Sequence, residues 1–198
     1  LQLTSVRRVT HLKKLLQSPF SLHKELIARI ERECAHARAG RKAHIMAQMN
    51  SLVEPQIIQA LYQASQHGVR IDLIVRGICC LRPGVPGLSE NIRVRSIIGR
   101  FLEHPRIYWF LNDGKEEAWL SSADWMDRNF FRRVEVAFPI TEPELRDRLV
   151  KEALSYSLAD NTQAWELRSD GSYERAQPGT HQAFTAQTAL LKELAESP

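Results

Sequence analysis

One histidine and several arginines flank two hydrophobic segments in the middle of the chain. Residues 102–140 contain LEHPRIYWF and, further on, LSSADWMDRNFFRRVEVAFPI. The packing of a strand pair does not require such charged side chains, whereas functional groups commonly lie on loops and strand ends that a rigid sheet supports. Several fixed positive donors near one histidine favour a site for phosphate over one for a neutral ligand. The residues concerned are His104, Arg106, Arg128, Arg132 and Arg133.

The composition is that of an ordinary globular domain with a mild preference for anions. The chain has 198 residues, of which 43% are hydrophobic and 25% charged, and a net charge of +4 from 27 basic and 23 acidic side chains. This length suffices for one well-filled core. The small positive excess favours anions without indicating nucleic acid. No apolar run reaches the roughly 20 residues that span a bilayer, and no signal peptide is recognisable.

The three cysteines, Cys34, Cys79 and Cys80, argue against structural disulfides and against zinc. Their number is odd and two are adjacent, whereas disulfide frameworks use paired cysteines. The sequence has no Cys-x-x-Cys or Cys/His spacing of the zinc-binding type, so we predict no metal ligands here. This cysteine usage fits a reducing cytoplasm. The chain begins at Leu1 and not at Met, so we expect a piece of a longer protein.

Hydrophobic periodicity predicts a parallel strand pair in the first half of the chain. Two helix patterns, one after Ser21 and one opening at Pro55, alternate with two short apolar strands. A strand-helix-strand order implies a right-handed crossover between parallel strands. Ligands of such sheets bind outside the carboxyl ends of the strands, where Asn50 and Arg76 lie. The predicted elements are a helix at 21–37, a strand at 44–49, a helix from 55 that Gly68 ends, and a strand at 69–75.

Further strands, a hairpin and two helices are predicted for the rest of the chain. The long loop 79–91 contains two Pro and two Gly, which is typical of functional or mobile segments. Asn112-Asp113-Gly114 is a strong hairpin signal. No internal repeat and no second domain is evident, so the fold class is α/β with a single domain. The predicted elements are a strand at 92–97 with Arg93 and Arg95 outward, strands at 106–111, 118–120 and 134–138, a helix at 142–159, a small hairpin around Asp170-Gly171 and a helix at 181–195.

Each candidate site residue also has an ordinary structural interpretation. A lone histidine such as His104 is more often a plain surface or core residue, and only its charged neighbours shift this balance. Arg76 could simply end a strand and reach solvent. Asp124 is well placed to cap a short helix, and we expect that role whatever else it does. Arg133 and Glu135 share a face of the predicted strand, so a cross-strand ion pair worth about 0–1 kcal/mol is the alternative for them. Arg132 and Arg133 would alternate across that strand, so only one of them could face a site.

Five long segments carry a family resemblance. They are IVRGICCLRPGVPGLSENIRVRSIIGRFLEH (74–104), SSADWMDRN (121–129), RRVEVAFPI (132–140), AGRKAHIMAQMNSLVEPQII (39–58) and WELRSDGSYERA (165–176). They extend over nearly the whole chain, and the central ones are long and specific. Together they resemble the C-terminal domain of bacterial polyphosphate kinase, type 1 family.

The resemblance implies both an activity and a fold. Family members reversibly transfer the terminal phosphate of ATP to inorganic polyphosphate, with Mg²⁺ and a phosphohistidine intermediate. Their two C-terminal domains resemble phospholipase D, each with a mixed sheet flanked by helices, and the active site lies in a tunnel between them. This chain resembles the last domain, so the phosphorylated histidine is expected in the preceding, absent domain. The implied organisation is a linker from that domain (1–20), the phospholipase D-like catalytic domain (21–160), and a hairpin and helix packed on it (161–198).

The resemblance also assigns roles by position. His104 is implied to be the second histidine, which faces the first across the cleft, and together with Arg76 it matches the residues that bind the nucleotide phosphates. Arg133 and Glu135 match a pair near the phosphates. ATP and Mg²⁺ are implied to be held mainly with residues of the absent domain. Because polyphosphate is a linear polyanion, further contacts are expected from Asn50, Arg93, Arg106, Asp124 and Arg128, with Arg95 and Arg100 at the tunnel or its mouth.

The implied partners are ATP or ADP, polyphosphate, the remaining domains of the parent chain and further copies of the whole protein, but no nucleic acid. The implied location is the cytoplasm or the periphery of the inner membrane. The present piece alone is expected to be inactive. Three residues depart from the family pattern, since many relatives have Lys in place of Gln48, Ser in place of Pro105 and Gly in place of Ser121. The phospholipase motif also expects His-x-Lys, whereas Arg106 occupies its second position.

Two other functions remain open. A phospholipase D-like phosphodiesterase or nuclease would need a second His-x-Lys motif, which we expect this chain to lack. A non-catalytic module would hold ATP or polyphosphate for a partner, and this piece would behave in that way if the nucleophile lies elsewhere.

Overall fold

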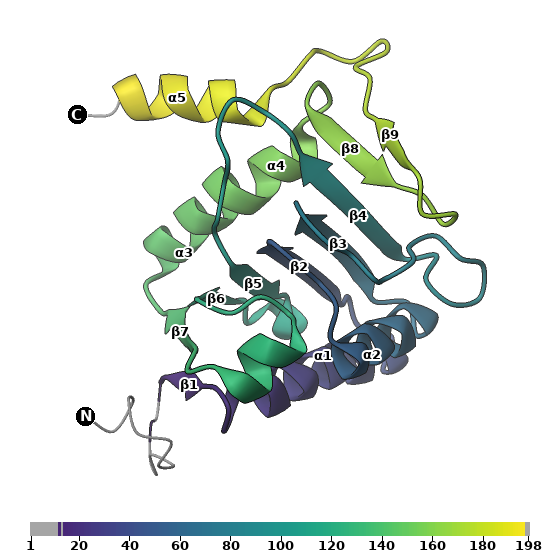
Figure 1. Ribbon diagram of the computed structural model, residues 1–198, viewed down its shortest axis with the longest axis vertical. Coiled ribbons are helices and arrows are strands. Elements are labelled where there is room, and N and C mark those ends of the chain that lie inside the picture. The colour runs from purple at the N-terminus through teal and green to yellow at the C-terminus, as the bar shows by residue number, and fades with distance from the viewer. Residues whose placement is uncertain (1–11, 13, 197–198) are drawn as a thin grey trace.

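A computed structural model describes residues 12 and 14–196, which form one mixed β-sheet with helices on both faces (Figure 1). Its nine strands lie in the order β1-β7-β6-β5-β2-β3-β4-β8-β9. β2, β3 and β4 run parallel, and every other neighbouring pair is antiparallel. This confirms the predicted α/β class. The strands are β1 (Leu16–Gln17), β2 (His44–Met49), β3 (Arg70–Val75), β4 (Ile92–Ile97), β5 (Ile107–Phe110), β6 (Glu117–Ser121), β7 (Val136–Ile140), β8 (Ala164–Leu167) and β9 (Tyr173–Arg175).

The helices follow the sequence predictions with two differences. The predicted helix at 142–159 contains a π-helical turn, and the last helix starts at Ala186 because the backbone of Phe184 is bonded to Asn161 instead of to a helical turn. No helix within residues 12 and 14–196 is long and apolar enough to cross a bilayer. The helical elements are α1 (Leu22–Arg38), α2 (Pro55–Gln66), η1 (Asn112–Gly114), η2 (Arg128–Arg132), α3 (Pro143–Leu149), η3 (Val150–Ser155), α4 (Tyr156–Ala159) and α5 (Ala186–Glu196).

Two apolar cores lie on opposite faces of the sheet, because successive side chains of a strand point to opposite sides. One core joins Leu26 of α1 and Leu61 of α2 to Ile45 of β2. The other joins Leu154 of η3 to Met46, the next residue of β2. A central strand buried on both sides is therefore mostly apolar, as Ile45, Met46, Ala47 and Met49 of β2 are.

The first strand lies where a linker was expected. Leu16 and Gln17 pair with β7 as an edge strand of the sheet, so the expected linker 1–20 belongs to the sheet from Leu16 onward. Residues 1–11 and 13 of that linker lie outside the described part of the chain. A strand of two residues has no measurable alternation, and for this reason periodicity could not predict it.

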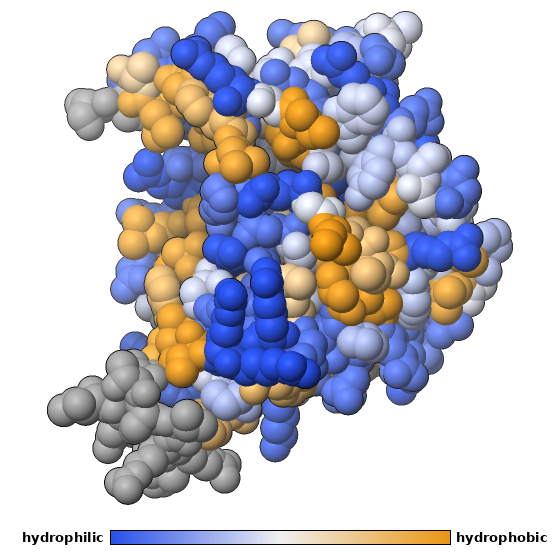
Figure 2. Space-filling model, viewed as in Figure 1, coloured by the Kyte–Doolittle hydropathy of each residue, from blue (hydrophilic) through white to orange (hydrophobic). Residues whose placement is uncertain are grey.

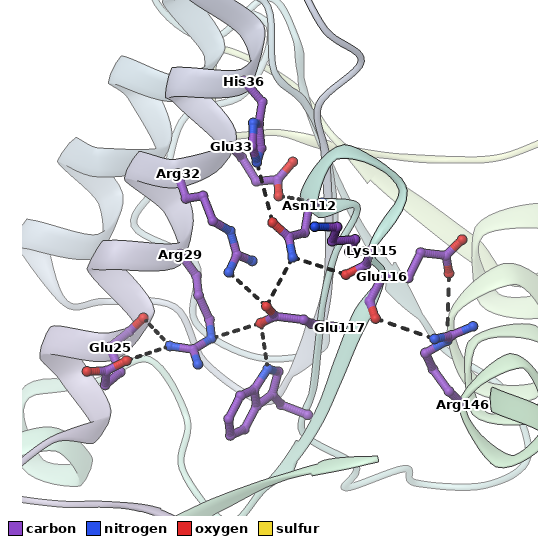
Figure 3. Close-up of polar contacts among 11 residues, drawn as sticks. Glu25, Arg29, Arg32, Glu33, His36, Asn112, Lys115, Glu116, Glu117 and Arg146 are labelled. Carbon is purple, nitrogen blue, oxygen red and sulfur yellow. Dashed lines mark hydrogen bonds and ion pairs between the residues drawn. The ribbon is translucent and has the colours of Figure 1, made fainter. Parts of the chain in front are cut away.

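A network of charged side chains fastens α1 to the β5–β6 hairpin (Figure 3). The Glu117 carboxylate accepts hydrogen bonds from Arg29 at 3.1 Å, from Arg32 at 2.7 Å and from Asn112 at 3.2 Å. Burial would raise the pKa of Glu117, but the neighbouring arginines outweigh it and hold this pKa below its usual range. The buried Glu33 carboxylate accepts the Asn112 backbone N–H at 2.7 Å. The hairpin is thereby fixed at its turn, and its opposite end contributes to the candidate site.

Candidate functional site

Most of the predicted site residues gather at one edge of the sheet, where the ends of neighbouring strands meet. β2, β3, β4 and β6 end at this edge, and the antiparallel strands β5 and β7 begin there. Asn50 directly follows β2, and Arg76 directly follows β3. His104 lies in the loop between β4 and β5, Arg106 directly precedes β5, and Asp124 follows β6. We call this set of strand ends the site edge.

Four side chains form a continuous hydrogen-bonded chain at the site edge. Arg76 Nε donates to Asn50 Oδ1 at 2.6 Å, and Asn50 Nδ2 donates to Asp124 Oδ2 at 3.3 Å. Arg106 approaches the same carboxylate with two donors, Nη2 at 3.1 Å from Oδ2 and Nε at 3.3 Å from Oδ1. Only the Nε of Arg76 takes part in its hydrogen bond to Asn50. Within the described part of the chain, its terminal nitrogens have no protein partner. Two guanidinium groups are thus oriented by one amide and one carboxylate.

Asp124 organises this chain from a buried position. It is 6% exposed, and its Oδ1 also accepts the backbone N–H of Asn50 at 2.7 Å and that of Ser51 at 3.3 Å. Burial alone would raise the pKa of Asp124, but the hydrogen bonds from Arg106 and Asn50 outweigh it and hold this pKa below its usual range. The prediction that Asp124 caps a helix is wrong, because η2 starts after Asp127 and the Asp124 carboxylate is taken by other loops.

Gly77 permits the close approach of β2 and β3 at the site edge. Its N–H donates to the Asn50 carbonyl at 2.8 Å, and a Cβ on Gly77 would lie only 2.8 Å from that same oxygen. A side chain at position 77 would therefore push the two strand ends apart. The short distance between the Arg76 and Asn50 side chains therefore requires glycine at position 77.

His104 lies on an exposed loop beside a cavity. Its side chain is exposed and makes no hydrogen bond within the described part of the chain. Its carbonyl oxygen accepts a bond from Arg106 Nη1 at 3.3 Å. A cavity of about 220 Å³ lies between this loop and the ends of β2 and β3. Its walls include Gln48, Arg76, Arg100 and Glu103 and the apolar Ile74 and Ile98.

Glu135 is anchored at the start of β7, whereas Arg133 is open to solvent. The Glu135 carboxylate, 9% exposed, accepts bonds from Ser122 Oγ and, at 2.7 Å, from Asn129 Nδ2. Arg133 is exposed and has no ion pair among the described residues, so the alternative interpretation of Arg133 and Glu135 as a cross-strand ion pair is wrong. Arg132 ends η2 and neither arginine lies in a strand, so the expected alternation of the two is wrong as well.

Three other predicted arginines have different surroundings. Arg93 lies near the start of β4, which is parallel to β3, and therefore at the edge of the sheet opposite the site edge. Arg95 donates from Nη1 to the carbonyl of Leu158 at 2.5 Å and pairs with Glu166, so it binds the C-terminal end of α4. Arg128 opens η2 and is exposed. Neither Arg93 nor Arg95 joins the residues that the site edge brings together.

The site edge offers cationic donors but does not fit a magnesium site of its own. Within residues 12 and 14–196 no group of three or more His, Cys, Asp or Glu side chains is arranged to hold a metal ion. The carboxylates of Asp124 and Glu135 already accept several hydrogen bonds from the protein. Mg²⁺ needs oxygen ligands in octahedral geometry, which these two engaged groups do not supply.

The family of this chain follows from its match to known proteins. The model of "Polyphosphate kinase C-terminal domain 2" matches residues 15–187, which include all the strand ends of the site edge. The chain belongs to this family. Polyphosphate kinase of Neisseria gonorrhoeae is 60% identical over 178 residues, which cover 90% of this chain and 26% of that protein. Polyphosphate kinase of Pseudomonas aeruginosa is 57% identical over 195 residues, which cover 98% of this chain and 28% of that protein.

Solved structures agree with the family and with the fold. The crystal structure of polyphosphate kinase from Porphyromonas gingivalis matches with a TM-score of 0.91 and 38% identity, over 96% of this chain and 29% of that one. The phospholipase D family member Nuc from Salmonella typhimurium matches with a TM-score of 0.56 and 17% identity, over 79% of this chain and 97% of that one. The second match bears on the fold alone, and it confirms the phospholipase D-like architecture. The polyphosphate kinase domain described here spans about a quarter of the length of its curated relatives.

Proposed function

We propose that this chain is the phosphate-holding C-terminal part of a polyphosphate kinase, which reversibly transfers the terminal phosphate of ATP to inorganic polyphosphate. The hydrogen-bonded chain from Arg76 through Asn50 and Asp124 to Arg106 carries this proposal, because it holds two guanidinium groups in fixed orientations next to the His104 loop. Fixed guanidinium groups match the charge and the planar donor geometry that phosphate requires. Membership of the polyphosphate kinase family supports the same activity.

In the proposed reaction, a histidine in the part of the kinase that precedes this chain accepts the phosphoryl group. The bond between the γ-phosphorus of ATP and its bridging oxygen breaks, a phosphorus–nitrogen bond to that histidine forms, and ADP leaves with the bridging oxygen. His104 faces the leaving group and donates a hydrogen bond or a proton to it. A terminal oxygen of polyphosphate then takes the phosphoryl group from the histidine, so the polymer grows by one phosphate.

The arginines of the site edge supply the electrostatic part of this reaction. Phosphoryl transfer depends mainly on positioning and on neutralising charge on the transferred group. We assign Arg76 to the nucleotide phosphates, and Arg106 and Arg133 to phosphates near the reacting centre. Asn50 and Asp124 orient the guanidinium groups. Glu135 acts through Ser122 and Asn129, Arg128 extends the positive surface, and Arg93 would meet only a distant part of a long polymer.

In the proposed kinase, residues outside this chain bind magnesium. When bound with ATP, Mg²⁺ would supply neutralisation of part of the phosphate charge. Since the site edge does not fit a metal site of its own, we place the protein ligands of that ion outside this chain. None of the roles assigned to the residues of the site edge depends on such ligands.

The surroundings of the site edge support a position inside a larger protein. Three large apolar side chains close to it, Ile78, Ile98 and Leu102, are exposed. Hydrophobic areas on the face shown in Figure 2 are separated by hydrophilic ones, as in the mixed surfaces where domains meet. We propose that the preceding domain packs here, that the whole kinase forms homo-oligomers in the cytoplasm or at the periphery of the inner membrane, and that it does not bind nucleic acid.

The alternative functions have weaker support. A phosphodiesterase of the phospholipase D type would need a second His-x-Lys motif across the cleft from His104. His11 and Lys13 have that spacing, but both lie outside the described part of the chain. A non-catalytic phosphate-binding module would use the same arginines, and a labelling experiment separates it from a kinase.

We expect acid-labile protein phosphate on the full-length kinase but not on this chain alone when each is incubated with γ-labelled ATP and Mg²⁺. The physical reason is that the proposed phosphoryl acceptor lies outside this chain. The measurement is label retained on the protein at alkaline pH and lost in acid, together with label in polyphosphate. Label on the isolated chain would instead make a histidine of this chain a nucleophile. Absence of label and of polyphosphate in the full-length protein would favour the binding module.

Arg76→Ala in the full-length kinase is expected to raise KM for ATP at least tenfold. A charge-assisted hydrogen bond to phosphate is worth about 1.5–3 kcal/mol, which corresponds to a factor of roughly 10 to 100. Arg41→Ala is the matched control, because Arg41 is an exposed arginine that pairs with Asp113 at the hairpin turn. Unchanged KM and kcat in the Arg76 variant would remove this residue from the site.

A further inference from the structure

The loop that carries His104 is fastened to the first turn of the C-terminal helix α5. Gln187, 5% exposed, donates from Nε2 to the Phe101 carbonyl at 2.8 Å and to Glu103 Oε1 at 2.8 Å. Its Oε1 accepts the Phe101 backbone N–H at 3.0 Å. One side-chain amide thus bonds both backbone groups of one loop residue and a carboxylate two residues further on. Such two-sided bonding specifies both the position and the orientation of the loop.

Glu103 extends this connection to the centre of the sheet. Its second oxygen, Oε2, accepts a hydrogen bond from Gln48 Nε2 at 3.2 Å. Gln48 is a buried residue of the central strand β2. The residue directly before His104 is therefore held between β2 and α5, while Arg106 bonds the His104 carbonyl from the other side.

The packing of this loop leaves no room for a shift toward α5. A Cβ on Gly99 would collide with Gln187 Oε1 and would lie 2.5 Å from Gln163 Oε1. Moving Gln187 away would break its bond to the Phe101 N–H. Gly99 is therefore part of the contact between this loop and Gln187 of α5.

The start of α5 is itself held in place by a buried carboxylate. Asp160, 1% exposed, accepts the Ala186 N–H on Oδ2 at 2.8 Å. Its Oδ1 accepts the backbone N–H groups of Thr162, Gln163 and Ala164 at 2.9, 2.6 and 3.1 Å. The end of α4 thus fixes the start of α5, where Gln187 lies.

We propose that Gln187 is a positioning residue for His104, acting through Glu103 and the backbone of Phe101. This inference rests on the proposed function, because it concerns the same histidine. Helix α5 then contributes to the reaction through its contact with the His104 loop. A shift of a reacting group by about 1 Å can cost on the order of a hundredfold in rate, so the loss of three hydrogen bonds to this loop would be measurable.

The first test is Gln187→Ala in the full-length kinase, with Thr188→Ala as its control because Thr188 is the exposed neighbour on the same turn. We expect the Phe101 amide to exchange with solvent deuterium at least roughly tenfold faster in the Gln187 variant. We also expect kcat to fall on the order of tenfold with little change in KM for ATP. The Thr188 variant should match the wild type in both measurements. Unchanged exchange at Phe101 would overturn the proposal.

The second test asks whether Gln187 acts through His104. If it does, Gln187→Ala should lower the residual rate of a His104→Ala enzyme by less than about twofold, because interacting residues are not additive. An equal loss in both backgrounds would mean that Gln187 serves the fold and not His104, and would reject the proposal. Gly99→Ala provides an independent variant that should reproduce the loss of kcat. A His104→Ala enzyme with normal activity would instead contradict the function proposed for the site, whatever Gln187 does.

Discussion

His104→Ala in the full-length kinase is expected to lower kcat for polyphosphate synthesis at least about a hundredfold, the range in which a general acid or base contributes. The imidazole is exposed and makes no hydrogen bond within the described part of the chain, so its removal leaves the protein contacts intact. The unfolding temperature should therefore stay that of the wild type. The measurement is initial rate against ATP concentration, combined with thermal unfolding of the same preparation.

His181→Ala is the control for this variant, since His181 is an exposed histidine between β9 and α5 to which no role in the reaction is assigned. It should have wild-type kcat. Near-normal turnover after the loss of His104 would withdraw its role at the leaving oxygen. A lower unfolding temperature would mean that the side chain supports the fold instead.

Asp124→Asn is expected to cost about 2 kcal/mol in the free energy of unfolding at pH 7 and to abolish most of the activity. The amide would bring a donor to face Arg106 and Asn50, which are donors themselves, and would leave the Arg106 guanidinium without its counter-charge. The series of hydrogen bonds that orients Arg76 would be interrupted at Asp124. Urea denaturation gives the stability, and the rate of polyphosphate synthesis gives the activity.

The stability cost of Asp124→Asn should depend on pH in a defined direction. The pKa of Asp124 is lowered on folding, so its ionised form stabilises the folded chain above the unfolded pKa of about 3.9, and this contribution is lost as pH falls through the folded pKa. The difference in the free energy of unfolding between wild type and variant should thus be constant near neutrality and shrink below about pH 4. Asp127→Asn is the control, because Asp127 is exposed and, among residues 12 and 14–196, pairs only with Arg132. A difference that grew on acidification would contradict this account.

The fold was predictable where local patterns are strong. β2 and β3 are mostly apolar, the Asn112-Asp113-Gly114 turn specifies the β5–β6 hairpin, and Pro55 and Gly68 mark the limits of α2. The rule that ligands bind at the carboxyl ends of parallel strands places Asn50 beside Arg76, and the structure confirms this contact.

The remaining features depend on contacts between distant segments, which no local pattern encodes. Alternation along β4 predicts that Arg95 faces outward, but its side chain is only 17% exposed and donates to the last carbonyls of α4. Asp124 precedes a helical turn as a capping residue would, yet its carboxylate accepts the backbone N–H of Asn50 from a neighbouring loop instead. Gln187 is one amide in an amphipathic helix, and nothing in its spacing distinguishes it. The sequence could therefore indicate which residue types form the site edge, but not which of them bind ligand and which hold their neighbours.

The order of the strands has a consequence for the way in which the domain assembles. The sheet begins with β1 and ends with β9, and β1 is paired with β7, so that the first described strand meets a segment from the last third of the chain. Contacts between segments so far apart form slowly, because closing the long loop costs conformational entropy before any hydrogen bond between the segments can form. We therefore expect the β2–β3–β4 unit and the β5–β6 hairpin to form early and the β1–β7 pair to close last. The Ser18 N–H donates to the Glu135 carbonyl at 2.9 Å, so this late step adds a backbone hydrogen bond next to the segment with Arg133 and Glu135.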